Sequence, residues 1–131
     1  MYQELPKLAA KPLTFLPFQF HAFILSKMLT KIFKEQIVEG DCDFLRARWL
    51  KLNIADLDIE YFFSLGSRGE VKVQKSADES VSIRGNLNEF ILLAARKEDP
   101  DTLFFQRKLV IEGDTELGLE VKNLIDSADL N

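Results

Sequence analysis

The spacing of the apolar residues changes after Gly40, and this change constrains the fold more than any other feature of the chain. Before Gly40, apolar residues recur every three or four positions, which is typical of a helix with one buried face. After Gly40, short segments alternate between apolar and polar residues, which is typical of strands in a sheet with one wet face. The helical face consists of Ile24, Leu25, Met28, Leu29, Ile32 and Phe33. We therefore expect an α+β domain.

The alternating segments predict four strands, over residues 48–54, 57–65, 70–74 and 80–84. Between the second and the third of them, Gly66-Ser-Arg-Gly69 has the composition of a hairpin turn. Since one face of each strand is polar, we expect these four strands to form an antiparallel meander with one face in water.

The third quarter of the chain returns to helical spacing. Asn86 and Glu89 stand three residues apart, as in a capping box, and predict a helix from residue 86 to about residue 97. A turn at Asp99-Pro-Asp-Thr then restarts helical structure through residue 105. This part of the chain is therefore expected to form two consecutive helices.

One more strand and one more helix complete the chain. The strand is predicted over 108–112, and the helix begins at Asp114 or Thr115 after Gly113. One apolar stripe of that helix contains Leu117, Val121, Leu124, Ile125 and Ala128. The predicted order is α-β-β-β-β-α-α-β-α, with a five-stranded, mostly antiparallel sheet covered by helices.

The first helix, predicted from Pro17 to Ile37, is apolar on nearly all sides in its first half. At 100° per residue, Phe20 and Phe23 project on the side of the later lysines, and Phe18 projects on the opposite side. Two explanations stay open: residues 1–13 fold over these rings, or the rings contact lipid or a partner. A membrane contact would use Phe18, Phe20, Phe23, Lys27, Lys31 and Lys34.

The distribution of charge leaves the same choice open. Residues 1–38 carry a net charge of +3, whereas the whole chain carries −4 and its remainder therefore carries −7. Either the basic front meets an anionic surface, or a basic helix packs on an acidic domain. The acidic total argues against nucleic acid as a partner.

Length and composition exclude several classes of protein. A chain of 131 residues fits one domain, and its single cysteine, Cys42, excludes an internal disulfide framework and a four-cysteine zinc site. The first residues, with Glu4 and Pro6, lack the pattern of a secretory signal. The apolar run 13–29 is interrupted by polar residues, so we do not expect it to cross a bilayer. We expect a cytoplasmic protein that associates peripherally with membranes.

The sequence offers little for catalysis. His21 is the only histidine and falls on the apolar side of the first helix, as a core or pocket-lining residue would. No sequence signal indicates an activated thiolate at Cys42. The acidic clusters lack the spacing of a calcium loop and suit caps and wet faces instead. We therefore predict no catalytic residue, no metal site and no cofactor.

Phenylalanine supplies 11 of the 14 aromatic residues. In a small α+β domain, this excess is explained either by dense packing or by a cavity for an apolar ligand. Composition alone leaves both explanations open.

Residues 99–126 closely resemble the sterol carrier protein type-two family, in its branch that serves ubiquinone biosynthesis. Ala94-Ala-Arg-Lys97, Asp43-Phe-Leu and Arg48-Trp-Leu50 resemble that family too. The resemblance covers roughly residues 40–127 and is most specific over 94–126.

The resemblance implies a five-stranded sheet, a hydrophobic tunnel and no catalytic activity. It implies polyprenylated quinone precursors or phospholipids as ligands, and an iron–sulfur hydroxylase pair of the oxygen-independent pathway as partner. We accordingly expect a lead-in and membrane-contact helix over 1–39 and a lipid-binding domain over 40–131.

The expected tunnel lining combines this resemblance with the positions of the large apolar residues. It consists of Trp49, Phe62, Phe90, Leu93, Phe104, Phe105, Leu117, Val121, Leu124 and Ile125. For each of them, ordinary core packing is an equal alternative. Relatives continue with a further apolar helical stretch after the last helix, so the tunnel boundary and a homo-oligomeric state stay open.

Two other functions are alternatives to a lipid carrier. A protein-interaction module would hold a ubiquinone-biosynthetic complex together without carrying a ligand, and would have a filled interior. An enzyme would need a polar, water-excluded pocket around His21 or Cys42.

Overall fold

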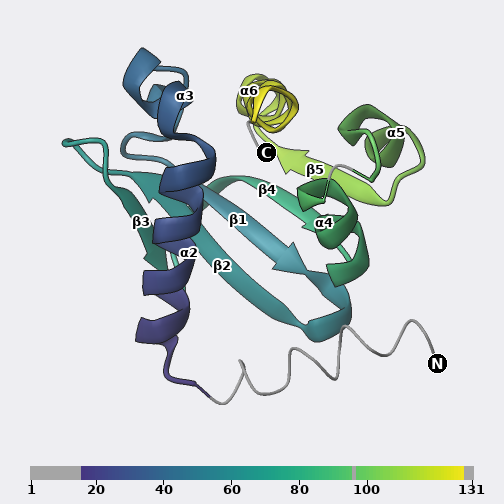
Figure 1. The fold of residues 1–131 in the computed structure, drawn as a ribbon, viewed down its shortest axis with the longest axis horizontal. Helices are drawn as coiled ribbons and strands as arrows, with labels where there is room; N and C mark the ends of the chain where they lie inside the picture. Colours follow the sequence, from purple (N-terminus) through teal and green to yellow (C-terminus); the bar gives the residue numbers. More distant parts are fainter. Residues whose placement is uncertain (1–15, 96, 129–131) are drawn as a thin grey trace.

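The computed structural model describes residues 16–95 and 97–128, which form one sheet with helices on one side (Figure 1). The strands are β1 (Trp49–Ile54), β2 (Ile59–Leu65), β3 (Val71–Gln74), β4 (Glu79–Gly85) and β5 (Leu109–Gly113). The helices are α2 (Phe18–Ile32), α3 (Lys34–Glu39), α4 (Leu87–Ala94), α5 (Pro100–Phe105) and α6 (Thr115–Ser127). Short 3₁₀ turns, η2 (Asp43–Leu45) and η3 (Ala55–Leu57), flank β1. The predicted order of helices and strands is confirmed, except that the first helix is divided in two.

The sheet has the order β3-β2-β1-β4-β5. The pairs β1–β2, β2–β3 and β4–β5 are antiparallel, so the prediction of a mostly antiparallel sheet is confirmed. The prediction of a four-strand meander is wrong at its last strand, because β4 pairs in parallel with β1 instead of continuing from β3. Alternation fixes which side chains face inward and does not fix which strand lies alongside.

The two faces of the sheet differ as the alternation predicted. Leu52, Phe63 and Ile83 share the inner face, under the helices. On the outer face, the Lys51 ammonium lies 3.5 Å from a Glu60 carboxylate oxygen and 3.3 Å from one of Glu79. Cross-strand pairs of opposite charge suit a face in water.

The first helix is divided at Phe33. Its backbone leaves the helical region there (φ −106°, ψ 21°), so α2 ends and the short α3 follows. Gly40 ends α3 in the left-handed conformation (φ 88°), in agreement with the predicted stop. The Gln36 side-chain amide donates to the Ser127 carbonyl oxygen (2.8 Å), which ties α3 to the end of α6. A single helix from residue 17 to residue 37 is therefore a wrong prediction.

Two helix N-termini are capped by carboxylates. Asp114 caps α6 by accepting the Leu117 amide (3.0 Å), which resolves the alternative left open by the sequence. The capping box predicted for α4 is wrong, because the side chain of Asn86 makes no cap hydrogen bond. Instead, an oxygen of Asp56 in η3 accepts the Leu87 amide (2.9 Å). This cap comes from 31 residues earlier in the chain, so local spacing could not reveal it.

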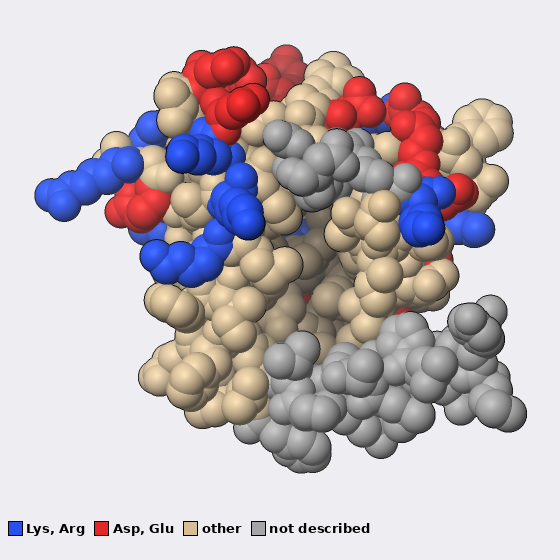
Figure 2. All heavy atoms as spheres, in the orientation of Figure 1, with Lys and Arg blue, Asp and Glu red and all other residues tan. Residues whose placement is uncertain are grey.

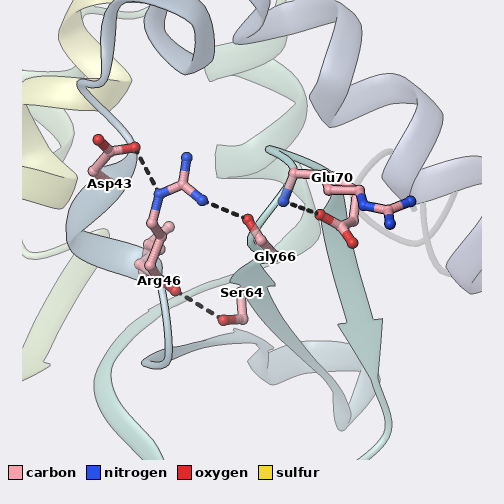
Figure 3. A network of polar contacts seen from close by, with 7 residues as sticks. Asp43, Arg46, Ser64, Gly66 and Glu70 are labelled. Carbon is pink, nitrogen blue, oxygen red and sulfur yellow. Dashed lines mark hydrogen bonds and ion pairs between the residues drawn. The ribbon is translucent and has the colours of Figure 1, made fainter.

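Polar contacts fasten η2 to the hairpin between β2 and β3 (Figure 3). The Arg46 guanidinium donates to Asp43 (3.0 Å) and to the Gly66 carbonyl oxygen (2.8 Å). The buried Ser64 hydroxyl donates to the carbonyl oxygen of Leu45 (2.8 Å). The predicted hairpin turn is confirmed by the hydrogen bond from the Gly66 amide to the Glu70 carbonyl oxygen. These bonds fix one end of the space between the sheet and the helices.

Candidate functional site

A cavity of about 240 Å³ lies between the inner face of the sheet and the helices. Figure 2 shows the surface hollowed between α2 and α4, in the orientation of Figure 1. The lining residues are Leu25, Leu29, Phe33, Ile37, Cys42, Leu45, Leu50, Leu52, Phe63, Ser64, Leu65, Val71, Ile83, Phe90, Leu93, Val121, Leu124 and Ile125. Both the central strands and the helices therefore contribute walls.

The wall from α2 follows directly from helical geometry. Leu25 and Leu29 are four residues apart, so they lie above one another on one face of the helix, and Phe33 follows at its end. The floor comes from alternate residues of the strands, such as Leu50 and Leu52 of β1. The helical spacing and the strand alternation that predict the fold therefore also determine which side chains line the cavity.

The lining is apolar almost throughout, and no charged residue belongs to it. The Ser64 hydroxyl is turned to the Leu45 carbonyl oxygen. Burial, together with the charges of Asp41 and Asp43, raises the pKa of the Cys42 thiol to about 11. A neutral thiol and a satisfied hydroxyl leave the cavity suited to an apolar guest.

The size of the cavity can be compared with a known case. An engineered apolar cavity of about 150 Å³ stays dry and binds benzene, which has six carbon atoms. By the same ratio, about 240 Å³ accommodates roughly ten carbon atoms of an apolar chain. The cavity therefore suits a segment of a lipid chain.

A larger groove of about 670 Å³ lies between η2 and α6. Its lining includes the carboxylates of Asp41, Asp43 and Glu120. A groove bordered by three carboxylates is a wet surface and does not suit an apolar ligand.

A polar pair stands beside the apolar cavity. The His21 Nδ1 atom of α2 lies 2.9 Å from the Tyr61 hydroxyl of β2. The rings of Phe18 and Phe63 lie 6.2 and 6.4 Å from the Tyr61 ring, between centroids. Burial raises the pKa of the Tyr61 phenol above its usual range, so the hydroxyl stays protonated. His21 thus lies half-buried against the sheet, as its place on the helix predicted.

The predicted lining residues divide into two groups. Phe90, Leu93, Val121, Leu124 and Ile125 line the cavity. Their role as lipid contacts stays a prediction.

The other predicted residues lie away from the cavity. Phe62 is buried, in register with Lys51 of the outer face, and Trp49 is half-buried at the start of β1. Leu117 packs in the core with Val81. Phe104 and Phe105 border a separate groove between α5, β5 and α6, together with Arg107 and Lys122.

The walls that come from the first helix and the first strands were not among the predicted lining residues. Leu25 and Leu29 belong to the predicted apolar face of the first helix, and Leu52 and Phe63 are apolar positions in the alternation of the first two predicted strands. These alternating positions were the signal, since a cavity under a sheet must use the inward side chains of its central strands.

The outward face of α2 carries large apolar side chains in water. The exposed ones are Phe20, Phe23, Ile24 and Met28, and Phe23 is the most exposed of them at 62%. Lys27 and Lys31 of α2 and Lys34 at the start of α3 are exposed as well, and Figure 2 shows basic side chains grouped above an uncharged part of the helix. Phe18 lies on the other side, against Tyr61. We call the exposed apolar residues and these lysines the outer face of α2.

Within the described ranges, no helix is both long enough and apolar enough to span a bilayer. Among the same residues, no group of histidine, cysteine and carboxylate side chains could hold a metal ion.

Two comparisons of the sequence agree on the family. The SCP-2 sterol transfer family matches residues 25–126. The chain is 42% identical over 125 residues to the ubiquinone biosynthesis accessory factor UbiT of Escherichia coli K12, which covers 95% of this chain and 71% of that protein.

Two solved structures have the same fold. The ubiquinone synthesis protein UbiJ-SCP2 superposes with a TM-score of 0.65 at 14% identity, over 85% of this chain and 93% of that one. The sterol carrier protein domain 2 of Helicoverpa armigera gives a TM-score of 0.50 at 18% identity, over 76% and 83%. With its fold, its apolar cavity and these matches, the chain belongs to the SCP-2 sterol transfer family.

Proposed function

We propose that this protein is a non-catalytic lipid-binding accessory factor of ubiquinone biosynthesis that shields the prenyl tail of quinone precursors. The observation that supports it most strongly is the apolar cavity of about 240 Å³ between the sheet and the helices. The 42% identity to a ubiquinone biosynthesis accessory factor supports the pathway. The hydroxylase pair of the oxygen-independent branch is the expected recipient of the bound precursor.

The physical need for such a protein follows from the hydrophobic effect. Each buried CH₂ group contributes about 0.8 kcal/mol, so a polyprenyl tail strongly prefers the bilayer to water. An enzyme outside the bilayer reaches the ring only when the tail is shielded. A wall of leucine, phenylalanine and isoleucine shields it without directed bonds and tolerates tails of different length.

The size of the cavity favours presentation over complete extraction. Roughly ten carbon atoms correspond to about two isoprene units. The cavity as it stands covers the units nearest the ring, and the rest of a long tail stays in the membrane. The protein therefore works at the bilayer surface.

The outer face of α2 is the proposed membrane contact. Exposed rings such as Phe20 and Phe23 enter the boundary between headgroups and acyl chains, and Lys27, Lys31 and Lys34 meet anionic headgroups. The same helix lines the cavity with Leu25 and Leu29. A tail can then pass from the bilayer into the cavity around one helix.

Extraction of bound lipid followed by mass spectrometry tests this function. The purified protein is expected to carry a prenylated quinone precursor or a phospholipid. Leu29→Trp adds a large side chain inside the cavity and should reduce the bound lipid severalfold. Met28→Trp makes the same kind of change on the exposed side of the same helix and should leave it unchanged.

The alternative, an assembly module without a ligand, predicts a different result. No lipid would be recovered from the wild-type protein, and both tryptophan variants would behave alike. That outcome would reject the carrier.

A further inference from the structure

The Tyr61 hydroxyl is out of place on the inner face of the sheet. Among the paired strand positions of the described chain, this face carries Leu50, Leu52, Ile54, Ile59, Tyr61, Phe63, Leu65, Val71, Val73, Val81, Ile83, Gly85, Leu109, Ile111 and Gly113. Every side chain in that set except Tyr61 is a hydrocarbon or glycine. A single phenol in such a surface marks a place where a polar group is needed.

The phenol stands next to the cavity and not inside it. Tyr61 precedes the lining residue Phe63 by two positions on the same face of β2, and their ring centroids are 6.4 Å apart. Its hydrogen-bond partner, His21, precedes the lining residue Leu25 by one helical turn. Both elements therefore place the pair just beyond the same end of the cavity.

The surroundings of the pair suit a flat ring. Phe18, His21 and Tyr61 are tilted relative to one another, with ring centroids between 6.0 and 6.4 Å apart. Aromatic rings favour such tilted neighbours. The ammonium of Lys75 lies 5.8 Å from the centre of the Phe18 ring and brings a cation to this cluster.

A phenol hydroxyl can donate one hydrogen bond and accept two. The contact with His21 uses one of these bonds, whichever ring nitrogen carries the proton. In either tautomer the Tyr61 oxygen therefore keeps the capacity to accept a hydrogen bond from a hydroxyl of a ligand.

We propose that Tyr61 and His21, with the ring of Phe18, form the subsite for the oxygenated aromatic ring of a prenylated ligand. This inference rests on the proposed function: the isoprene units next to the ring fill the cavity, and a hydroxyl of the ring donates to the Tyr61 oxygen. The order of the two parts matches an amphipathic ligand, with an apolar cavity followed by a polar end.

Two probes of the same chain length test the subsite. Geranylphenol carries a ring hydroxyl and geranylbenzene does not, and each is titrated into the protein with NMR detection. The wild type should bind geranylphenol more tightly. Tyr61→Phe removes only the hydroxyl, and should weaken binding of geranylphenol about fivefold while leaving geranylbenzene unchanged.

Ser64→Ala is the matched control, because it removes the other hydroxyl beside the cavity, which is turned to the backbone of Leu45. It should leave the ratio of the two affinities as in the wild type. Any loss of fold would weaken both probes equally, so the ratio isolates the hydrogen bond.

Failure of the ring subsite and failure of the proposed function would give different results. Equal affinities for both probes in the wild type, or an unchanged ratio in Tyr61→Phe, would overturn the ring subsite and leave the proposed function standing. A wild type that binds neither probe would overturn the proposed function together with the subsite.

Discussion

At the scale of single residues, Cys42 shows how burial in an apolar cavity wall lowers the reactivity of a thiol. Its side chain is 4% exposed and lines the cavity. Burial, helped by the neighbouring carboxylates Asp41 and Asp43, raises the pKa of the thiol from 9.0 to about 11. At neutral pH it is therefore a small apolar group and a poor nucleophile.

The raised pKa of Cys42 has a consequence for stability. Between about pH 9 and pH 11 the unfolded chain loses the thiol proton and the folded chain keeps it. The unfolded state then binds fewer protons, so the free energy of unfolding falls as the pH rises, by at most about 1.4 kcal/mol per unit. Denaturant unfolding of the wild type and Cys42→Ala over this range should show a stability difference that shrinks with pH. A constant difference would contradict this account of the thiol.

Two residues, His21 and Tyr61, show how far sequence reasoning reaches at this scale. The helical position of His21 predicted a core or pocket-lining histidine, and it lies half-buried against the sheet. Its partner Tyr61 is 40 residues away, so no local pattern joins them. The single phenol in an otherwise apolar alternation was the only signal.

At the scale of helices and strands, α2 is the element with two apolar faces. One face lines the cavity through Leu25 and Leu29, and the other exposes Phe20, Phe23 and Met28 to water. A helix packed only on its own domain needs only the first of these faces. We propose that the second face meets a surface outside the molecule. The alternative, that residues 1–13 fold over it, concerns residues outside the described ranges.

Membrane docking by α2 is tested with vesicles that contain anionic lipid. Phe20→Asp with Phe23→Asp removes two exposed rings and adds two negative charges, so the bound fraction in co-sedimentation should fall about tenfold or more. Phe105→Asp with Leu119→Asp makes the same change in charge at exposed apolar residues of α5 and α6, and should leave binding intact. Added salt should weaken binding of the wild type, because salt screens the attraction between the lysines and the anionic headgroups.

Equal loss in both pairs of variants would mean that net charge alone controls binding. Full binding by the α2 variant would reject the outer face of α2 as the docking surface.

The elements themselves were largely predictable, because each follows from a local period of apolar residues. The parallel pairing of β4 with β1 and the cap of α4 by Asp56 were not, since both depend on contacts between distant segments. The break at Phe33 could not be predicted for a related reason. A hydrogen bond from Gln36 to Ser127 holds α3 against α6, and local helix propensity does not include such a contact. Tertiary contacts override the local pattern at these three places.

At the scale of the whole molecule, the two ends of the cavity differ in the residues that border them. Toward η2, the bonds of Arg46 and Ser64 hold the turn and the hairpin together (Figure 3). Toward the start of α2, the described structure has the His21–Tyr61 pair. Half of the predicted lining residues border the cavity, because α4 and α6 present one stripe each to the sheet, and their lipid contact stays a prediction. Phe104 and Phe105 are neighbours in the sequence. This position does not indicate that α5 borders a groove different from the cavity.

The central claim is that the space between the sheet and the helices receives an apolar chain. Intermolecular nuclear Overhauser effects between geranylbenzene and the methyl groups of the protein test it directly. The account predicts contacts with Leu25, Leu29, Ile83 and Val121, which line the cavity from three sides. Contacts confined to Ile24 and Met28 on the outer face of α2, or no contacts at a saturating concentration of probe, would contradict it.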